Sequence, residues 1–98
     1  MQKEEMDELG ERIEALEENQ LKIAKEFGKQ NVAFFHTLSG MRIAALKEDK
    51  YRFFEGYMKF KMGEASRYIG NAKDVEEVIS LTSQFTDDCI AYAESLLK

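Results

Sequence analysis

The chain has one histidine and one cysteine, and these are the side chains best suited to nucleophilic chemistry. His36 stands in the stretch FFHTLSGMR, and Cys89 lies far from it in the sequence. An imidazole on a helix can accept a phosphoryl group when solvent and a donor reach it. On a helical wheel His36 falls opposite an apolar stripe, so we expect it to face solvent. That stripe consists of Phe34, Leu38, Met41 and Ala45.

The segment HTLSG, residues 36–40, resembles the HTLKG motif of histidine-containing phosphotransfer domains. The resemblance implies that His36 is an alternative phosphoacceptor, with small neighbouring residues that leave room for a receiver domain. Ser39, however, stands where the motif has its lysine, and bulky residues follow at 41–43. We therefore favour the interpretation that His36 is a solvent-facing helical residue, and keep phosphotransfer as an alternative.

Other catalytic chemistry has little support in the sequence. Cys89 occupies an apolar position of its predicted helix, so it is better explained as a small buried hydrophobe than as a nucleophile. The chain has no Glu-x-x-His pair and no glycine-rich phosphate-binding loop. We expect no enzyme activity, no catalytic residue, no metal site and no cofactor.

Composition indicates a small soluble domain. A chain of 98 residues forms one domain, and no apolar run is long enough to span a membrane. The acidic stretch MQKEEMDEL at the N-terminus does not look like a signal peptide. Together with a single cysteine, these features predict a cytoplasmic protein.

Charge is arranged in three blocks along the chain. Residues 1–20 carry eight acids and two bases, a net −6; residues 21–73 carry eleven bases and five acids, a net +6. Residues 74–98 carry six acids and one base, a net −5. This acidic balance argues against a nucleic-acid partner, because no dense basic stripe is available to face phosphates.

A heptad pattern runs through residues 2–48 and predicts one long helix of the coiled-coil type. Its seam has spacings of three and four and contains no charge. The seam residues are Met6, Leu9, Ile13, Leu16, Gln20, Ile23, Phe27, Gln30, Phe34, Thr37, Met41 and Ala44. Because glycine has a low helix propensity, the sequence also allows a break in this helix near Gly28 or Gly40.

Two shorter amphipathic helices follow, at about 51–70 and 74–97. Gly70-Asn71 reads as the stop of the first. Asp74 and Glu77 form a capping-box-like pair at the start of the second. The apolar seam of this last helix is Val75, Val78, Thr82, Phe85, Cys89, Tyr92 and Leu96.

The helix lengths predict self-association. At about 1.5 Å per residue, the long helix is roughly twice the length of the others, so half of it lacks an intrachain partner. We therefore expect an all-α, oligomeric helical bundle, a dimer to a tetramer. In the alternative, the long helix breaks near Gly28 and its N-terminal piece folds back into a four-helix bundle. The expected oligomer seam comprises Met6, Leu9, Ile13, Leu16, Ile23 and Phe27.

The stretch YRFFEGYMKFKM, residues 51–62, combines aromatics and methionines with interleaved bases. A helix with such a wide apolar arc is either buried on two sides or offers one side to an apolar partner. We favour the first interpretation, a central bundle helix, and keep the second open.

Residues 29–98 resemble the phasins, helical proteins that coat polyhydroxyalkanoate granules in bacteria. The resemblance lies in QN before a long helix, in EASRY at the end of the middle helix, and in AKDVEEVISLTSQFTDDCIAYAE. The aromatic-rich middle helix and the lack of an Ala- and Gln-rich texture depart from the family.

The resemblance implies a non-enzymatic protein at the granule surface, which self-associates and adsorbs to the polymer or another apolar granule surface. The candidate contact residues are Phe53, Phe54, Tyr57 and Phe60. In solution a bundle or oligomer would hide them. A homo-oligomeric coiled-coil adaptor for a protein partner is the remaining alternative.

Overall fold

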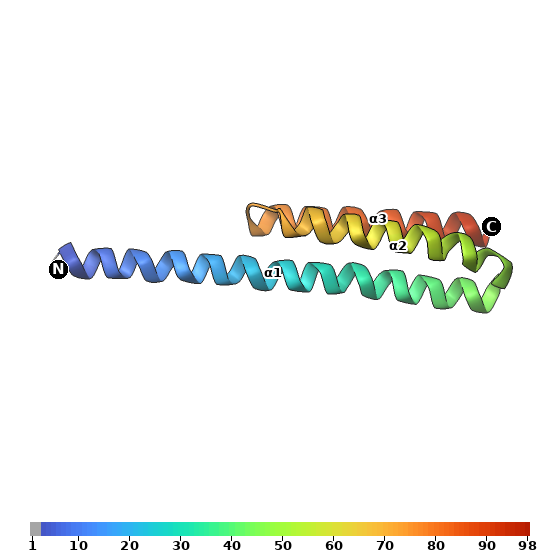
Figure 1. The fold of residues 1–98 in the computed structure, drawn as a ribbon, viewed down its shortest axis with the longest axis horizontal. Helices are drawn as coiled ribbons and strands as arrows, with labels where there is room; N and C mark the ends of the chain where they lie inside the picture. Colours follow the sequence, from blue (N-terminus) through green and yellow to red (C-terminus); the bar gives the residue numbers. More distant parts are fainter. Residues whose placement is uncertain (1–2) are drawn as a thin grey trace.

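The chain folds as a rod of three helices, one of which is about twice as long as the others. The computed structural model describes the backbone of residues 3–98 and the side chains of residues 7–98. The elements are α1 (Lys3–Leu46), a short 3-10 turn η1 (Glu48–Lys50), α2 (Tyr51–Gly70) and α3 (Val75–Leu97). The rod measures 68 × 17 × 17 Å, and α2 and α3 lie along one half of α1 (Figure 1). Within residues 3–98 there is no strand, which confirms the expected all-α fold.

Helix α1 is continuous through Gly28 and Gly40, the two positions at which the sequence allowed a break. The alternative four-helix bundle therefore does not form. Gly28 is buried where α3 crosses α1. A Cβ atom at this position would lie 2.6 Å from Thr82 Oγ1 and 3.2 Å from Val78 Cγ1. The glycine therefore allows the two helices to approach closely, and this packing offsets its low helix propensity.

Two lysines, Lys25 of α1 and Lys47 just after its last residue, contact the C-terminal ends of the shorter helices. Lys25 Nζ donates a hydrogen bond of 2.8 Å to Gly70 O, and Lys47 Nζ donates one of 2.6 Å to Lys98 O. The last carbonyl groups of a helix lack intrahelical partners and carry partial negative charge, so a cation is well placed there. These contacts help to hold α2 and α3 in register with α1.

The cap of α3 is formed by the pair that the sequence indicated. Asp74 Oδ1 accepts a hydrogen bond of 2.8 Å from the Glu77 backbone N–H. Glu77 Oε2 reaches back and accepts one of 2.9 Å from the backbone N–H of Lys73. Side chains thus satisfy one first-turn donor of α3 and the N–H of the residue before the N-cap, an arrangement that resembles a capping box.

The core consists of two clusters along the bundled half of the rod. One lies near the α2–α3 turn and the other near η1, where Phe54, Ile43 and Cys89 are fully buried. The first cluster contains Val32, Ala65, Ile69, Ala72, Val78 and Phe85. Of the predicted α3 seam, Val78, Phe85 and Cys89 are buried and Thr82, Tyr92 and Leu96 are half-buried, whereas Val75 is exposed.

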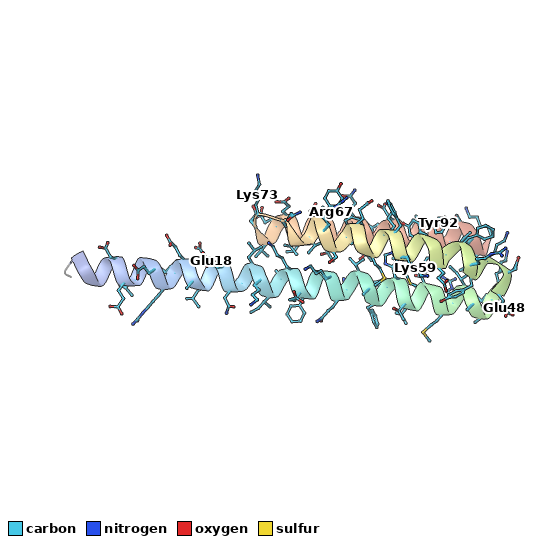
Figure 2. The ribbon with its side chains drawn as sticks, viewed as in Figure 1. Glu18, Glu48, Lys59, Arg67, Lys73 and Tyr92 are labelled. Atoms are coloured by element: carbon cyan, nitrogen blue, oxygen red, sulfur yellow. The ribbon has the colours of Figure 1, made fainter. Side chains whose placement is uncertain are left out.

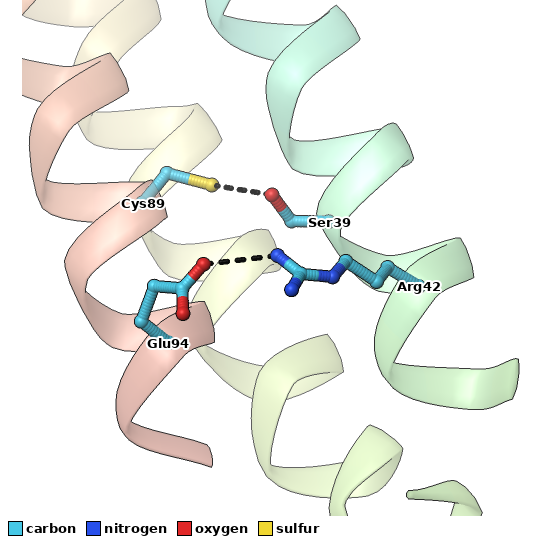
Figure 3. Close-up of polar contacts among 4 residues, drawn as sticks. All are labelled: Ser39, Arg42, Cys89 and Glu94. Carbon is cyan, nitrogen blue, oxygen red and sulfur yellow. Dashed lines mark hydrogen bonds and ion pairs between the residues drawn. The ribbon is translucent and has the colours of Figure 1, made fainter. Parts of the chain in front are cut away.

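Polar contacts join α1 to α3 beside the second cluster (Figure 3). Arg42 Nη1 and Glu94 Oε1 form an ion pair at 2.9 Å, and the Cys89 thiol donates a weak hydrogen bond to Ser39 Oγ at 3.7 Å. The ion pair is solvent-exposed, so it contributes little to stability and mainly orients the two helices.

The first part of α1, residues 3–20, extends beyond the α2–α3 turn, and we call it the overhang. Glu18 lies near the end of the overhang, next to the turn that carries Lys73 (Figure 2). All described side chains from Asp7 to Gln20 are exposed. No helix within residues 3–98 is both long and apolar enough to cross a lipid bilayer.

The close approach at Gly28 can be tested by adding one methyl group. We expect Gly28→Ala to lower the free energy of unfolding by about 1–2 kcal/mol, because overpacking outweighs the gain in helix propensity. The matched control is Gly56→Ala in α2, where a Cβ meets nothing within 4 Å. That change should raise stability by about 0.5–1 kcal/mol. Urea denaturation measures both, and equal stability of the two variants would contradict the close packing.

Candidate functional site

The expectation that His36 faces solvent is wrong. The side chain is 0% exposed, on the face of α1 that packs against α2 and α3. Its ring lies 6.2 Å from that of Phe54 and 6.1 Å from that of Tyr57, measured between centroids. In this packing a phosphoryl donor cannot approach the imidazole.

The error arises because α1 has two apolar faces. The stripe of Phe34, Leu38 and Met41 was assumed to be buried, but all three side chains are exposed. The buried face instead runs through small residues, and the Cβ position of Gly40 lies 3.5 Å from the ring of Phe54. The small residues beside His36 make room for aromatic side chains of α2, whereas the sequence interpretation assigned that room to a receiver domain.

The buried imidazole is held in one tautomer. His36 Nδ1 lies 2.8 Å from Val32 O, so Nδ1 carries the proton and donates it to this carbonyl. Nε2 is buried and has no hydrogen-bond partner. Burial lowers the pKa of His36, and the hydrogen bond to Val32 offsets this only in part. The neutral imidazole is therefore the form that the folded chain favours.

The most extensive functional feature is an apolar stripe on the outer side of α1. It follows the predicted heptad seam, and its large apolar members are about half exposed or more, up to 65% for Phe27. Met6, the first residue of the expected seam, lies outside the described side chains. We call this surface the α1 stripe; it contains Leu9, Ile13, Leu16, Gln20, Ile23, Phe27, Gln30, Phe34, Thr37 and Met41.

The inner face of α1 changes character where α2 and α3 end. From Leu21 onward it consists mostly of apolar or small residues, with Lys25 and His36 among them, and it packs against α2 and α3. In the overhang the same face carries Asp7, Glu11, Glu14 and Glu18. The acids show that the overhang does not extend the intrachain core. The α1 stripe is thus the apolar surface that the overhang and the bundled half have in common.

A second apolar surface lies on the outer side of α2, and we call it the α2 patch. Phe53 is 53% exposed and Phe60 is 66% exposed. The Lys50 ammonium lies 5.8 Å from the Phe53 ring, and the Lys61 ammonium lies 6.0 Å from the Phe60 ring. Cations at this distance from an aromatic ring are attracted to its face. The patch is therefore a pair of exposed rings with a basic rim.

The other two aromatic contact candidates belong to the interior. Phe54 is fully buried, and Tyr57 is half-buried and stacks on Tyr92 with ring centroids 4.2 Å apart. Desolvation, together with nearby charges such as Asp88, raises the pKa of Tyr57 to about 12. In the closed bundle, only Phe53 and Phe60 of the four predicted contact residues form an exposed pair.

The described residues contain no group of three or more His, Cys, Asp or Glu side chains that could hold a metal ion. Cys89 is a free, buried cysteine, as the sequence indicated. Burial raises the pKa of its thiol, with a smaller opposing effect from Ser39, so the reactive thiolate is disfavoured. No family model, curated protein or solved structure matches the chain.

The buried histidine predicts a dependence of stability on pH. Because the pKa of His36 is lowered in the folded chain, the unfolded chain binds the proton first as pH falls. The contribution of His36 is therefore complete above about pH 6.5 and is lost as pH falls towards its folded pKa.

We expect His36→Phe to remove this part of the pH dependence, because phenylalanine fills the same aromatic site without titrating. Urea denaturation from pH 7.5 to pH 5 measures it, and the comparison with the wild type separates His36 from the carboxylates. If both chains lose the same stability over this range, the assignment to His36 is wrong.

Proposed function

We infer that the protein is a phasin-like structural protein, without enzymatic activity, that coats polyhydroxyalkanoate granules. The observation that carries the proposal is the presence of two exposed apolar surfaces on different helices, the α1 stripe and the α2 patch. We assign self-association to the first and contact with the granule to the second. The phasin resemblance of residues 29–98 points to the same class of protein.

The composition of the α2 patch supports contact with an apolar surface. Phe53 and Phe60 are two turns apart, so they project from the same side of α2. Gly56, between them, is exposed, and the space above it is open. Two rings on a flat helix surface can lie against a polymer, while Lys50 and Lys61 remain at its edge in water.

The charge distribution supports dispersal of coated granules. The overhang carries an excess of acids, and α3 together with its N-cap Asp74 carries six acidic residues, none of them buried. Like charges on neighbouring granules repel each other, which opposes their fusion.

Granule contact through the α2 patch can be tested with Phe53→Glu/Phe60→Glu. Both side chains are exposed, so the bundle should still fold. Each buried phenylalanine contributes about 1.5–3 kcal/mol, so we expect the affinity for polyhydroxyalkanoate beads to fall at least about tenfold. Sedimentation of the protein with the beads measures the bound fraction.

The matched control is Ile79→Glu/Ile90→Glu on α3, which replaces two exposed apolar residues with the same two charges. This control should bind as the wild type does. Wild-type protein that ignores the beads at low micromolar concentration would refute the proposed function. Equal loss in both double variants would refute the assignment to α2.

The reactivity of Cys89 tests whether the bundle opens on adsorption, because this single cysteine is buried in the closed bundle. If Phe54 and Tyr57 contact the granule, the core must open and expose Cys89. We expect slow alkylation of Cys89 by iodoacetamide in solution and alkylation at nearly the rate of the unfolded chain on beads. Slow alkylation of fully adsorbed protein would mean that the bundle stays closed and that Phe53 and Phe60 suffice.

The coiled-coil adaptor is the second candidate, and the overhang favours it. The overhang bears a stripe of Leu9, Ile13 and Leu16 that no other part of the described chain covers. An adaptor would use this stripe for a different protein and would show no affinity for polymer beads. The bead experiment therefore distinguishes the two candidates.

A further inference from the structure

The α1 stripe requires a partner as long as itself. From Leu9 to Met41 it covers about 50 Å at 1.5 Å per residue. Its seven large apolar side chains are about half exposed or more, and at roughly 100 Å² each they offer about 700 Å². A standard interface takes roughly 800 Å² from each partner, so one helix along the whole stripe would form it. Among the helices of residues 3–98 only α1 itself has that length, and the same helix of a second copy fits the stripe from end to end.

The polarity of the stripe is symmetric about its middle in all pairs but one. Among residues whose numbers add up to 50, Gln20 matches Gln30 and the apolar residues match each other: Leu9 with Met41, Leu16 with Phe34 and Ile23 with Phe27; the pair of unlike polarity is Ile13 with Thr37. The centre of this symmetry is residue 25. A helix that runs in the opposite direction along the stripe therefore presents each glutamine to another glutamine, and apolar side chains to apolar side chains in all other layers except that of Ile13 and Thr37.

We propose that two copies pair antiparallel through their α1 stripes, about a two-fold axis at the level of residue 25. In this register Gln20 of one copy faces Gln30 of the other, twice per dimer. A glutamine side chain has both donors and an acceptor, so the two amides can bond to each other across the seam. Any other antiparallel register that keeps the heptad places a glutamine against an apolar side chain, which leaves its amide unpaired. A parallel, in-register pair would also match Gln20 with Gln20 and Gln30 with Gln30, so charge and side-chain size decide between the two orders.

Charge selects the antiparallel order over the parallel one. Residues 7–18 carry six acids and one base, a net −5. In a parallel pair these two segments would lie side by side and repel each other. In the antiparallel pair residues 7–18 lie beside residues 32–43 of the second copy, which carry one base and no acid. The next residues, 44–52, add three bases and two acids and leave this end weakly basic.

Side-chain size favours the same order. In a parallel pair Phe27 would face Phe27 of the second copy, and likewise Phe34 would face Phe34 and Thr37 would face Thr37. In the antiparallel pair Phe34 faces Leu16 and Phe27 faces Ile23, so large rings meet smaller aliphatic side chains. Such alternation fills the seam more evenly. One local contact favours the parallel order, an Arg12–Glu17 pair across the seam, but an exposed ion pair of this kind contributes little.

The fold leaves room for this pairing. The inner face of α1 holds α2 and α3, and the stripe lies on its other side, so the second copy does not collide with the bundle. The overhang of each copy lies along the bundled half of the other, and both stripes are covered completely. The inference rests on the self-association in the proposed function and is independent of binding to the polymer.

Disulfide trapping distinguishes the two orders. The variants Leu9→Cys and Met41→Cys are each prepared alone, and the wild type, with only the buried Cys89, is the control. In the antiparallel pair residue 9 of one copy faces residue 41 of the other. We therefore expect a cross-linked dimer when the two variants are mixed and oxidised, and little cross-linking of either variant alone. Non-reducing electrophoresis measures the products.

Efficient cross-linking of each variant with itself, and none between the two variants when they are mixed, would mean a parallel pair and overturn the inference while leaving self-association intact. A mass of 11.3 kDa for the wild type in solution, the mass of one chain, would overturn both.

Ile23→Glu should convert the dimer to a monomer, because it buries two charges near the axis. Ile90→Glu, an exposed apolar position on α3, should remain dimeric. If Ile23→Glu still forms the wild-type dimer, the stripe is not the interface.

Discussion

The packing of Phe54 against the small residues of α1 decides which side of the long helix faces solvent. The ring is fully buried beside His36 and over Gly40, where a larger side chain would hold α2 away. Once α2 and α3 occupy this face, the heptad seam of α1 is turned outward along its whole length. The buried His36 and the exposed Phe27 and Phe34 of α1 follow from this choice of face, whereas the overhang follows from the greater length of α1.

This arrangement limits the stability of a single, isolated chain. A small domain gains limited stability from its core, and this one leaves large apolar side chains of α1 in water. A monomeric soluble protein rarely exposes an apolar surface that is continuous over such a length. Covering the stripe would remove apolar area from water without any change in the bundle. Association through the stripe would therefore stabilise the folded state without any rearrangement of the three helices.

Much of the fold could be predicted from the sequence, because it depends on local signals. The absence of proline, the heptad repeat, Gly70-Asn71 and the Asp74 cap indicated three helices close to those observed. The orientation of α1 could not be predicted in the same way. Its outer face has the larger apolar residues, and a helical wheel ranks faces by hydrophobicity. The buried face is instead determined by shape, because Gly28 and Gly40 allow the neighbouring helices to approach closely. A helical wheel contains no information about such close approach. The presence of glycines on the side of α1 that carries His36 was the signal that could have corrected the prediction.

The two apolar surfaces lie on different sides of the rod, which allows both to be used at once. Met62 and Ser66 line a groove next to α1. On the side towards α3, Tyr57 stacks on Tyr92, and the Tyr68 ring lies 6.2 Å from the Phe85 ring. Phe53 and Phe60 lie on the remaining, outer side of α2, away from α1. A second copy on the α1 stripe would therefore leave the α2 patch of each chain free. Because a dimer would present two such patches, its attachment to an extended surface would be stronger than that of one patch alone. The same pairing would join the two contacts through a rigid helix, so self-association and surface attachment would reinforce each other.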